Sequence, residues 1–464
     1  MKFMGGLEAV NLPLDYQNEM RALLKDEYDE FIKCYGQPCF KGIRINTLKV
    51  DEQKFREIFP FKIKSAKFSK SSFYLEEDIP AIGNLPLHHA GAFYAQEPSA
   101  ASAVTILAPK PGEKILDLCA APGGKSTQIA AALAGKGLLW SNEIVKNRAQ
   151  ILLSNIERMG VRNAVVSSCH PELLCKKLAG FFDKVLVDAP CSGEGMFRKN
   201  PLAIGEWSKE HVKMCAKRQL SILNVAAQAL KAGGVMVYST CTFSREENEQ
   251  TVYNFLQKNK NFELEEINCD FGRPALHIDA TSGQINTNLA RRVFPQDGGE
   301  GHFVARLRSK EANTKKTYEF SHKRGQIKNN KLDEGIFSNF FKNSLYGHIE
   351  AFNGKWVILP DGLPSISGLN VLRAGVLLAT SKASFIEPAH AAFMAAKPKE
   401  LYQKVDFNLN SSEILAFLRG EEVSISEKMS GYVGVCVDGI TVGFGKAVNG
   451  RLKNKYPKGL RILS

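Results

Sequence analysis

One stretch of the chain decides its fold: K-I-L-D-L-C-A-A-P-G-G-K-S, residues 114–126. An apolar run ends in this stretch, a glycine-rich turn follows it, and a helical pattern begins at Ser126. Small residues let the backbone approach a ligand closely, and the first turn of a helix offers unbonded N–H groups. The stretch therefore predicts a strand, a ligand-binding turn and a helix.

Two kinds of site compete for this turn. A phosphate loop requires G-x-x-x-x-G-K-[ST], but Cys119 stands where the first glycine of that motif should be. A nucleoside site instead requires an acid after the second strand to bind the ribose hydroxyls, and Glu143 has that position. The sequence favours the nucleoside site, and a purely structural glycine turn is the alternative.

Apolar runs and helical periods alternate from about residue 90 to residue 308, which predicts βαβ units and a mostly parallel sheet. The runs are Ile115–Leu118, Leu138–Trp140, Ala164–Val166, Val185–Val187 and Val235–Tyr238. Helical patterns between the runs cover Ser126–Leu133, Lys146–Met159 and His211–Leu230. A last run, Phe303–Leu307, predicts an antiparallel strand at the edge of the sheet.

The 464 residues are too many for one hydrophobic core, so we expect several domains. The pattern predicts an N-terminal α+β module at 1–85, an α/β domain at 86–308, a basic linker at 309–331 and a further region at 332–464. In the last region, alternating valines around Asp438-Gly439 predict a hairpin over Gly431–Ala447.

Two cysteine tripeptides carry the chemistry, Pro190-Cys191-Ser192 and Thr240-Cys241-Thr242. Each follows an apolar run, so both thiols should emerge at strand C-termini, the edge where open α/β sheets bind ligands. Two thiols at that edge favour covalent chemistry on an electrophilic ring. Asp188, which ends the first of these runs, is either part of this site or a helix cap. The cysteine spacing fits no zinc site, so we expect no metal.

The formal charge of +13 favours a polyanionic partner. Six basic residues and no acid lie in Lys446–Arg461, so this segment is suited to contacting the backbone of a nucleic acid and stacking on its bases. The residues expected to make these contacts are Lys453, Lys455, Tyr456, Lys458 and Arg461. No apolar stretch approaches the roughly 20 residues needed to cross a bilayer. No signal-peptide core is found, so we expect a cytosolic protein that spans no membrane.

Three motifs together resemble the RNA cytosine-5 methyltransferases: Leu116–Thr127, Val187–Lys199 with its Pro-Cys pair, and Tyr238–Thr242 with its Thr-Cys pair. The resemblance extends over nearly the whole chain and is closest to the bacterial RsmF/YebU type, which modifies small-subunit ribosomal RNA. It implies S-adenosylmethionine as cofactor, a Rossmann-like class I methyltransferase core whose last strand is antiparallel, and a PUA-like α+β domain at the C-terminus.

The resemblance also implies a cofactor pocket. Its residues would be Cys119, Ala120, Ala121, Pro122, Gly123, Gly124, Lys125, Glu143, Arg148, His170 and Asp188. Among these, Glu143 would bind the ribose. The family usually has an acid near the adenine after the third strand, and here Cys169 or His170 takes that position, with His170 as our assignment.

In such enzymes a thiolate adds to carbon 6 of cytosine, which makes carbon 5 able to attack the methyl group. The resemblance assigns this attack to Cys241 and assistance with product release to Cys191. The sequence alone does not decide between the thiols, because DNA cytosine methyltransferases attack with the cysteine of their Pro-Cys motif. Asp188 would bind the N3/N4 edge of the ring, and Lys125 would supply a positive field.

A target base must leave its stack to reach thiols and cofactor, so we expect a flipped or single-stranded cytosine. We expect 16S ribosomal RNA as the substrate, free or in the 30S subunit, and a monomeric enzyme; transfer RNA is the alternative substrate. A catalytically silent protein that only binds ribosomal RNA during assembly is an alternative of another class. The two thiols argue against it, since affinity alone requires neither.

Overall fold

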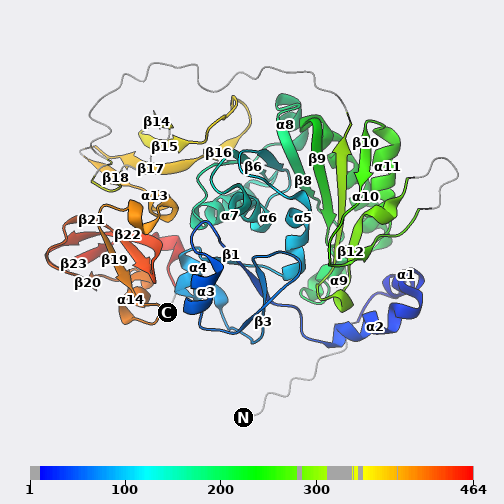
Figure 1. The fold of residues 1–464 in the computed structure, drawn as a ribbon, viewed down its shortest axis with the longest axis horizontal. Coiled ribbons are helices and arrows are strands. Elements are labelled where there is room, and N and C mark those ends of the chain that lie inside the picture. The colour runs from blue at the N-terminus through cyan, green and yellow to red at the C-terminus, as the bar shows by residue number, and fades with distance from the viewer. Residues whose placement is uncertain are drawn as a thin grey trace, which may run out of the picture.

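The structure of this chain is a computed structural model that describes residues 11–278, 285–310, 337, 339–342, 348–383 and 385–462. All but the first two residues of the linker expected at 309–331 lie outside the described residues. The described strands form four sheets. In Figure 1 the N-terminal sheet with β1 and β3 lies near the centre, and the C-terminal sheets lie at the left. None of the described helices is long and apolar enough to cross a membrane.

The N-terminal region contains a four-stranded sheet and a separate pair of helices. The sheet has the order β2-β3-β1-β4. Its elements are β1 (Gly42–Ile45), α3 (Glu52–Ile58), β2 (Ile63–Ser65), β3 (Ser72–Leu75) and β4 (Phe93–Ala95). Because β4 pairs with β1, this sheet extends beyond the boundary expected at residue 85.

The helical pattern at the N-terminus forms two helices, α1 (Leu14–Leu24) and α2 (Tyr28–Lys33). Between them Lys25 has a φ of 50°, which interrupts the α-helical path. The two helices share a hydrophobic cluster with Phe197, Phe243 and Phe294. They therefore cover the loops that follow β8 and β9, at a distance from the N-terminal sheet in Figure 1.

The central domain has a ten-stranded sheet in the order β11-β12-β13-β9-β8-β5-β6-β7-β16, with β10 beside β13. Its strands up to residue 309 are β5 (Lys114–Asp117), β6 (Leu138–Asn142), β7 (Ala164–Ser167), β8 (Phe182–Asp188), β9 (Leu230–Thr240), β10 (Phe262–Glu265), β11 (Arg273–Pro274), β12 (Arg291–Val293) and β13 (His302–Ser309). Helix α4 (Pro86–His89) lies between β3 and β4 and packs with the N-terminal sheet. The helices of the central domain are α5 (Ser102–Leu107), α6 (Gly124–Leu133), α7 (Lys146–Arg158), α8 (Pro171–Lys177), α9 (Pro201–Glu206), α10 (Lys209–Ala229) and α11 (Glu249–Lys258).

Strands β5 to β9 are parallel, as the alternating pattern predicts, and β13 is antiparallel to β9. The expectation that Phe303–Leu307 forms an edge strand is wrong, because β10 and β12 both pair with β13. These strands have four and three residues, too few to show periodicity in the sequence. At the opposite edge β16 (Val371–Ala374), from the C-terminal half of the chain, pairs with β7.

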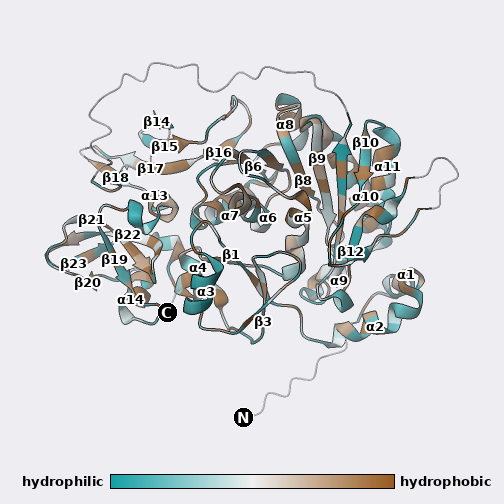
Figure 2. Ribbon diagram, in the orientation of Figure 1, coloured by the Kyte–Doolittle hydropathy of each residue, from teal (hydrophilic) through white to brown (hydrophobic). Residues whose placement is uncertain are grey.

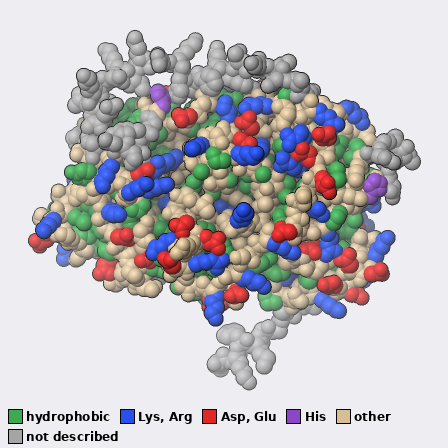
Figure 3. Space-filling view, viewed as in Figure 1, with side chains coloured by type: hydrophobic (Ala, Val, Ile, Leu, Met, Phe, Trp, Pro, Cys, Tyr) green, Lys and Arg blue, Asp and Glu red, His purple; other side chains and the backbone are tan. Residues whose placement is uncertain are grey.

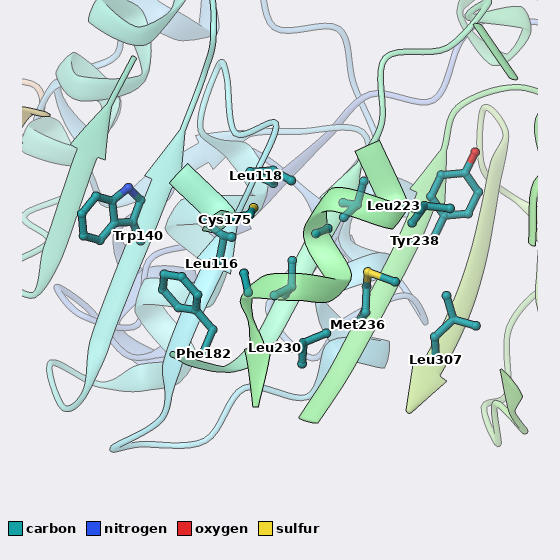
Figure 4. Close-up of a cluster of buried hydrophobic side chains, with 14 of the residues drawn as sticks. Leu116, Leu118, Trp140, Cys175, Phe182, Leu223, Leu230, Met236, Tyr238 and Leu307 are labelled. Atoms are coloured by element: carbon teal, nitrogen blue, oxygen red, sulfur yellow. The ribbon is translucent and has the colours of Figure 1, made fainter. Parts of the chain in front are cut away.

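A large apolar cluster lies between the central sheet and α10. Figure 4 shows Leu116, Trp140, Phe182 and Met236 from four strands facing Leu223 of the helix. Figure 2 shows the apolar residues concentrated on α5 and the central strands, while α3 and α11 carry polar residues outward. Because these strands are buried on both faces, they read as continuous apolar runs in the sequence.

The residues after 347 form two further sheets, of orders β14-β15-β17-β18 and β19-β21-β22-β23-β20. Their elements are β14 (His348–Phe352), β15 (Lys355–Leu359), β17 (Val376–Ser381), β18 (Ile386–Pro388), α13 (His390–Ala395), β19 (Lys404–Phe407), α14 (Ser412–Arg419), β20 (Val423–Ser424), β21 (Gly431–Val437), β22 (Ile440–Val448) and β23 (Arg451–Asn454). The predicted hairpin is confirmed, since β21 pairs with β22 and both turn residues, Asp438 and Gly439, have positive φ.

Candidate active site

The strand order of the central sheet reverses between β5 and β8, and crevices at such points bind ligands in α/β proteins. The glycine-rich turn leaves the carboxyl end of β5, and Asp188 is the last residue of β8. The Cys241 loop follows the neighbouring strand β9. The fold thus brings the three sequence motifs to one edge.

The two thiols lie in contact, with their Sγ atoms 3.3 Å apart. Both side chains are partly exposed. The hydrogen bond to Cys241 and burial together raise the pKa of the Cys191 thiol well above its usual value. This shift disfavours the thiolate form of Cys191.

Asp188 lies beside the thiols in a fixed hydrogen-bonding arrangement. Its Oδ2 is 2.7 Å from Lys125 Nζ, and its Oδ1 accepts a 2.6 Å bond from Ser239 Oγ. Burial by itself would lower the pKa of Lys125, but Asp188 outweighs burial and raises it, so the lysine is charged. Both carboxylate oxygens accept hydrogen bonds from side chains of the site, which argues against a helix-cap role for Asp188.

A buried carboxylate ties the two cysteine loops together. Glu247 Oε1 accepts from Ser192 N at 2.9 Å and from Gln219 Nε2 at 2.8 Å. Ser192 Oγ contacts Glu247 Oε2 and also Thr242 Oγ1, at 2.8 Å from the latter. The loop after β8 and the loop after β9 are therefore joined next to the thiols.

A second buried acid joins the same loops, since Glu194 Oε2 accepts from Phe243 N at 2.8 Å. Beside it, Gly195 N donates to Cys241 O, also at 2.8 Å. We did not identify Glu194 or Glu247 from the sequence. The run Arg245-Glu246-Glu247 precedes a helix and looks like an exposed helix start. Only burial, which the sequence does not show, separates Glu247 from its exposed neighbour Glu246.

The glycine-rich turn fits a bound ligand. Gly123 has a φ of +113°, and a Cβ there would lie 3.1 Å from the Leu152 side chain, so glycine is required. Beside the turn, Asp117 is fully buried, and its Oδ1 has no hydrogen-bond partner among the described residues. Burial raises the pKa of Asp117 to about 7. A donor from a ligand, such as an ammonium group, would satisfy this oxygen.

The acid expected at the ribose, Glu143, is linked to the glycine-rich turn through Arg148. The Glu143 side chain is 4% exposed, and its Oε1 accepts from Val145 N at 3.0 Å. Arg148 is 3.3 Å from Glu143 Oε2 and donates to Ala121 O at 3.2 Å. Arg148 thereby links the glycine-rich turn to the acid, and Ala120 N bonds to Asn142 O across the same strands.

The residues expected near the adenine have other partners. His170 is exposed and caps α8, since its Nδ1 accepts from Glu172 N at 3.4 Å. Cys169 is fully buried, and its backbone bonds twice to the Asn142 amide. These contacts place neither side chain in the position of the family's carboxylate near the adenine. The adenine contact assigned to His170 therefore stays a prediction.

The residues expected to bind RNA divide into two groups. Lys453 and Lys458 are exposed, but Tyr456 is 3% exposed and its hydroxyl is 2.7 Å from His89 Nδ1. Lys455 is 2.7 Å from Glu387, and the Arg461 side chain is half-buried. The expectation that the Tyr456 ring stacks on RNA is wrong in this structure, because the ring is part of a domain junction.

The basic residues are not confined to that segment. Figure 3 shows Lys and Arg side chains spread over the visible face and interleaved with Asp and Glu.

Among the described residues, no group of His, Cys, Asp and Glu could hold a metal ion.

Four family models match successive parts of the chain. Residues 12–98 match the N-terminal domain of 16S rRNA methyltransferase RsmF, and residues 104–308 match the 16S rRNA methyltransferase RsmB/F model. Residues 337–395 match the first C-terminal domain of RsmF rRNA methyltransferase, and residues 404–462 match its PUA domain. The region expected at 332–464 therefore contains two domains, in agreement with its two sheets.

Curated relatives and solved structures agree with these models. The chain is 33% identical over 97% of its length to ribosomal RNA small subunit methyltransferase F of Vibrio vulnificus, of which 98% is covered. A relative with the same description from Pectobacterium carotovorum is 36% identical over 66% of this chain and 64% of its own.

Two solved structures each cover about two thirds of this chain. A methyltransferase homolog from Pyrococcus horikoshii has a TM-score of 0.58 and 28% identity, over 65% of this chain and 96% of its own. NSun6 from Pyrococcus horikoshii, solved with SFG, has a TM-score of 0.56 and 23% identity, over 66% of this chain and all of its own, and shows the fold alone. The chain belongs to the S-adenosylmethionine-dependent 16S rRNA methyltransferases of the RsmB/F family, in its RsmF group.

Proposed function

We propose that this enzyme methylates carbon 5 of a cytosine in 16S ribosomal RNA through a transient covalent bond between Cys241 and carbon 6 of the base. The observation that supports this most strongly is the pair of thiols, 3.3 Å apart, beside the Asp188–Lys125 pair. A pyrimidine ring needs a nucleophile and a group that stabilises charge on its polar edge, and both stand at this edge of the sheet.

The environment of the thiols supports Cys241 as the nucleophile. The raised pKa of Cys191 disfavours it as the attacking thiolate. This assigns the attacking thiolate to Cys241 and the proton-donating role to Cys191.

The reaction then proceeds in balanced steps. Cys241 Sγ bonds to carbon 6, and the electrons of the 5,6 double bond make carbon 5 the nucleophile. S-adenosylmethionine, when bound, supplies an electrophilic methyl group. Asp188 accepts a hydrogen bond from the 4-amino group of the base, with its carboxylate held by Ser239 and Lys125. As the S–C6 bond breaks, Cys191 donates its proton to the departing Cys241 sulfur, and the electrons of the bond between carbon 5 and its hydrogen re-form the 5,6 double bond. The proton released from carbon 5 passes through solvent water to the Cys191 thiolate.

The residues of the glycine-rich turn would hold the cofactor. Asp117 Oδ1 lacks a donor and suits an ammonium group, and Glu143 suits two hydroxyls. The N–H groups at the start of α6, next to Gly123, suit a carboxylate. These assignments, with Cys119 to Lys125 around the amino-acid end, agree with the pocket implied by the sequence.

We propose RNA as the partner, engaged by an enzyme that acts as a monomer in the cytoplasm. The match of residues 404–462 to a PUA domain supports this, as does the formal charge of +13. The substrate assignment to 16S rather than transfer RNA rests on the full-length relatives.

The test is bisulfite sequencing of ribosomal RNA from cells with and without this protein, which maps every new 5-methylcytosine. Purified enzyme, labelled cofactor and the mapped RNA then test the thiols. We expect Cys241→Ala to abolish transfer and Cys191→Ala to accumulate a covalent protein–RNA adduct that is visible on a denaturing gel. Cys269→Ala, a partly exposed thiol on another loop, is the control. An adduct formed by Cys241→Ala would reverse the roles, and unchanged transfer in both variants would refute the mechanism.

A further inference from the structure

His302 lies at the methyl-transfer edge without a role in the steps described above. It is the first residue of β13, where Val304 pairs with Ser239 of β9. Opposed residues of an antiparallel pair face the same side, and alternation places His302 on that side too. The His302 side chain therefore lies on the same face of the sheet as Ser239, which holds Asp188.

A chain of hydrogen bonds fixes which ring nitrogen of His302 carries hydrogen. Ser99 Oγ donates its only hydrogen to Glu97 Oε2, at 2.6 Å. Ser99 Oγ is also 3.0 Å from His302 Nδ1, so at that contact it must accept. Nδ1 consequently carries the hydrogen, and in a neutral ring Nε2 has the free lone pair.

The ring is neutral at physiological pH. Burial lowers the pKa of His302 to about 4, and Lys125 acts in the same direction. Glu97 and Asp188 oppose this shift and Lys199 adds to it, but burial outweighs them. Among the described residues, Nε2 has no hydrogen-bond partner, and 7% of the residue remains exposed.

The support of this ring is rigid. Glu97 also accepts from Ser99 N, at 2.9 Å, and from Ala100 N, at 3.1 Å, which caps the short helix that begins at Pro98. The turn before His302 is held by Glu300, which accepts from Phe40 N and lies 3.0 Å from Arg198 Nη1. Because its support is rigid, the Nε2 lone pair of His302 has a fixed direction. A lone pair held in this way can recognise a hydrogen-bond donor on a bound base.

We propose that His302 Nε2 accepts a hydrogen bond from the 4-amino group of the target cytosine, and so selects cytosine over uracil. This inference rests on the proposed function. The amino group of cytosine has two hydrogens, so Asp188 and His302 can each accept one. Uracil has a carbonyl oxygen in that position, which would face the Nε2 lone pair and leave Nε2 unpaired once the bound base excludes water.

The test separates the two ring nitrogens. Glutamine can place an oxygen where Nε2 lies, whereas asparagine reaches only the position of Nδ1. The probe is a 16S ribosomal RNA transcript containing 5-fluorocytidine, in which fluorine blocks loss of the carbon 5 substituent and traps the adduct. We expect His302→Asn to lower the trapping rate about 10-fold, the value of one hydrogen bond, and His302→Gln to stay within about 3-fold of the unchanged enzyme. His348→Gln, on the exposed strand β14, is the control.

Equal trapping rates for His302→Asn and His302→Gln, whether high or low, would overturn the proposal. A second RNA, with the mapped cytosine replaced by 5-fluoropyrimidin-2-one, lacks the amino group. With this RNA the two variants and the unchanged enzyme should trap at equal rates, and a persisting 10-fold difference would assign His302 a merely structural role. If Cys241→Ala also traps RNA, the proposed function fails instead, so the two failures are distinguishable.

Discussion

Short sequence motifs assigned two regions to RNA chemistry: the cysteine edge of the central sheet and the basic C-terminal segment after residue 450. In the structure the assigned side chains come together in the first region and have other partners in the second. At the edge, the assigned side chains meet: Cys191 contacts Cys241, and Asp188 contacts Lys125. In the segment, Tyr456 is buried against His89, and Lys455 pairs with Glu387.

The difference has a topological cause. Carboxyl ends of neighbouring parallel strands lie at one edge, so motifs that follow such strands converge whatever their sequence separation. No such rule fixes the position of a segment with basic and aromatic residues, because the same side chains can contact solvent, RNA or another domain. Four predictions sharpen or break this comparison.

The largest effect is expected from Asp188→Asn. The change removes the charge that Lys125 and Ser239 hold in place, so methyl transfer should fall roughly 10²- to 10⁴-fold at saturating cofactor. Labelled-cofactor assays measure this. Asp183→Asn is the matched control, since Asp183 lies at the other end of β8 and pairs with Lys231. A change below 10-fold would show that the edge is not the reaction centre.

Removing the buried link between the cysteine loops should affect both stability and rate. Glu247→Ala leaves Ser192 N and Gln219 Nε2 without their acceptor, which should cost about 1–3 kcal/mol of unfolding free energy. Transfer should fall as well, because the thiols lose their fixed separation. Urea unfolding and transfer assays test this against Glu246→Ala, the exposed neighbour. Equal stability of the two variants would refute the link.

Acid should weaken the domain junction around Tyr456. Burial lowers the pKa of His89 to about 4 and that of His390 to about 3, with Arg158 facing His89, and Lys49 and His89 facing His390. A folded pKa below the unfolded value means that the unfolded chain binds the proton first. The stabilisation is therefore complete above about pH 6.5 and is lost on acidification toward pH 3–4, by about 1.4 kcal/mol per pH unit and histidine.

His390→Leu tests this expectation. Between pH 6.5 and pH 4, the variant should take up as much as one proton fewer on unfolding. The slope of its unfolding free energy against pH should therefore be shallower. An unchanged pH profile in urea unfolding would contradict the expectation.

The smallest effects are expected at the exposed lysines of the C-terminal segment. Lys453→Ala and Lys458→Ala should each weaken RNA binding only a few-fold and reduce the slope of log affinity against log salt by about 0.7–0.9. Tyr456→Phe is the contrast, because its ring is buried, and it should change neither the affinity nor the slope. Weakened RNA binding by Tyr456→Phe would mean that the junction opens to expose the ring.

Several features of the fold follow from local pattern alone. The parallel strands of the central sheet read as apolar runs because both their faces are buried, and Asp438-Gly439 fixes the last hairpin through its positive φ angles. The short strands β10 and β12 could not be predicted, since they consist of four and three residues stabilised by pairing with β13. Strand β16 likewise exists because the exposed edge of β7 accepts a partner.

The sequence determined which groups can do chemistry here: two thiols, an acid and a glycine-rich turn, each placed by a strand end. Tertiary structure alone decided the partners of each group. The burial of Glu247, the orientation of the His302 ring through Ser99, and the use of Tyr456 at a domain junction all depend on residues distant in the chain. Desolvation and hydrogen-bond geometry set those roles, and neither is a property of a residue type or a spacing.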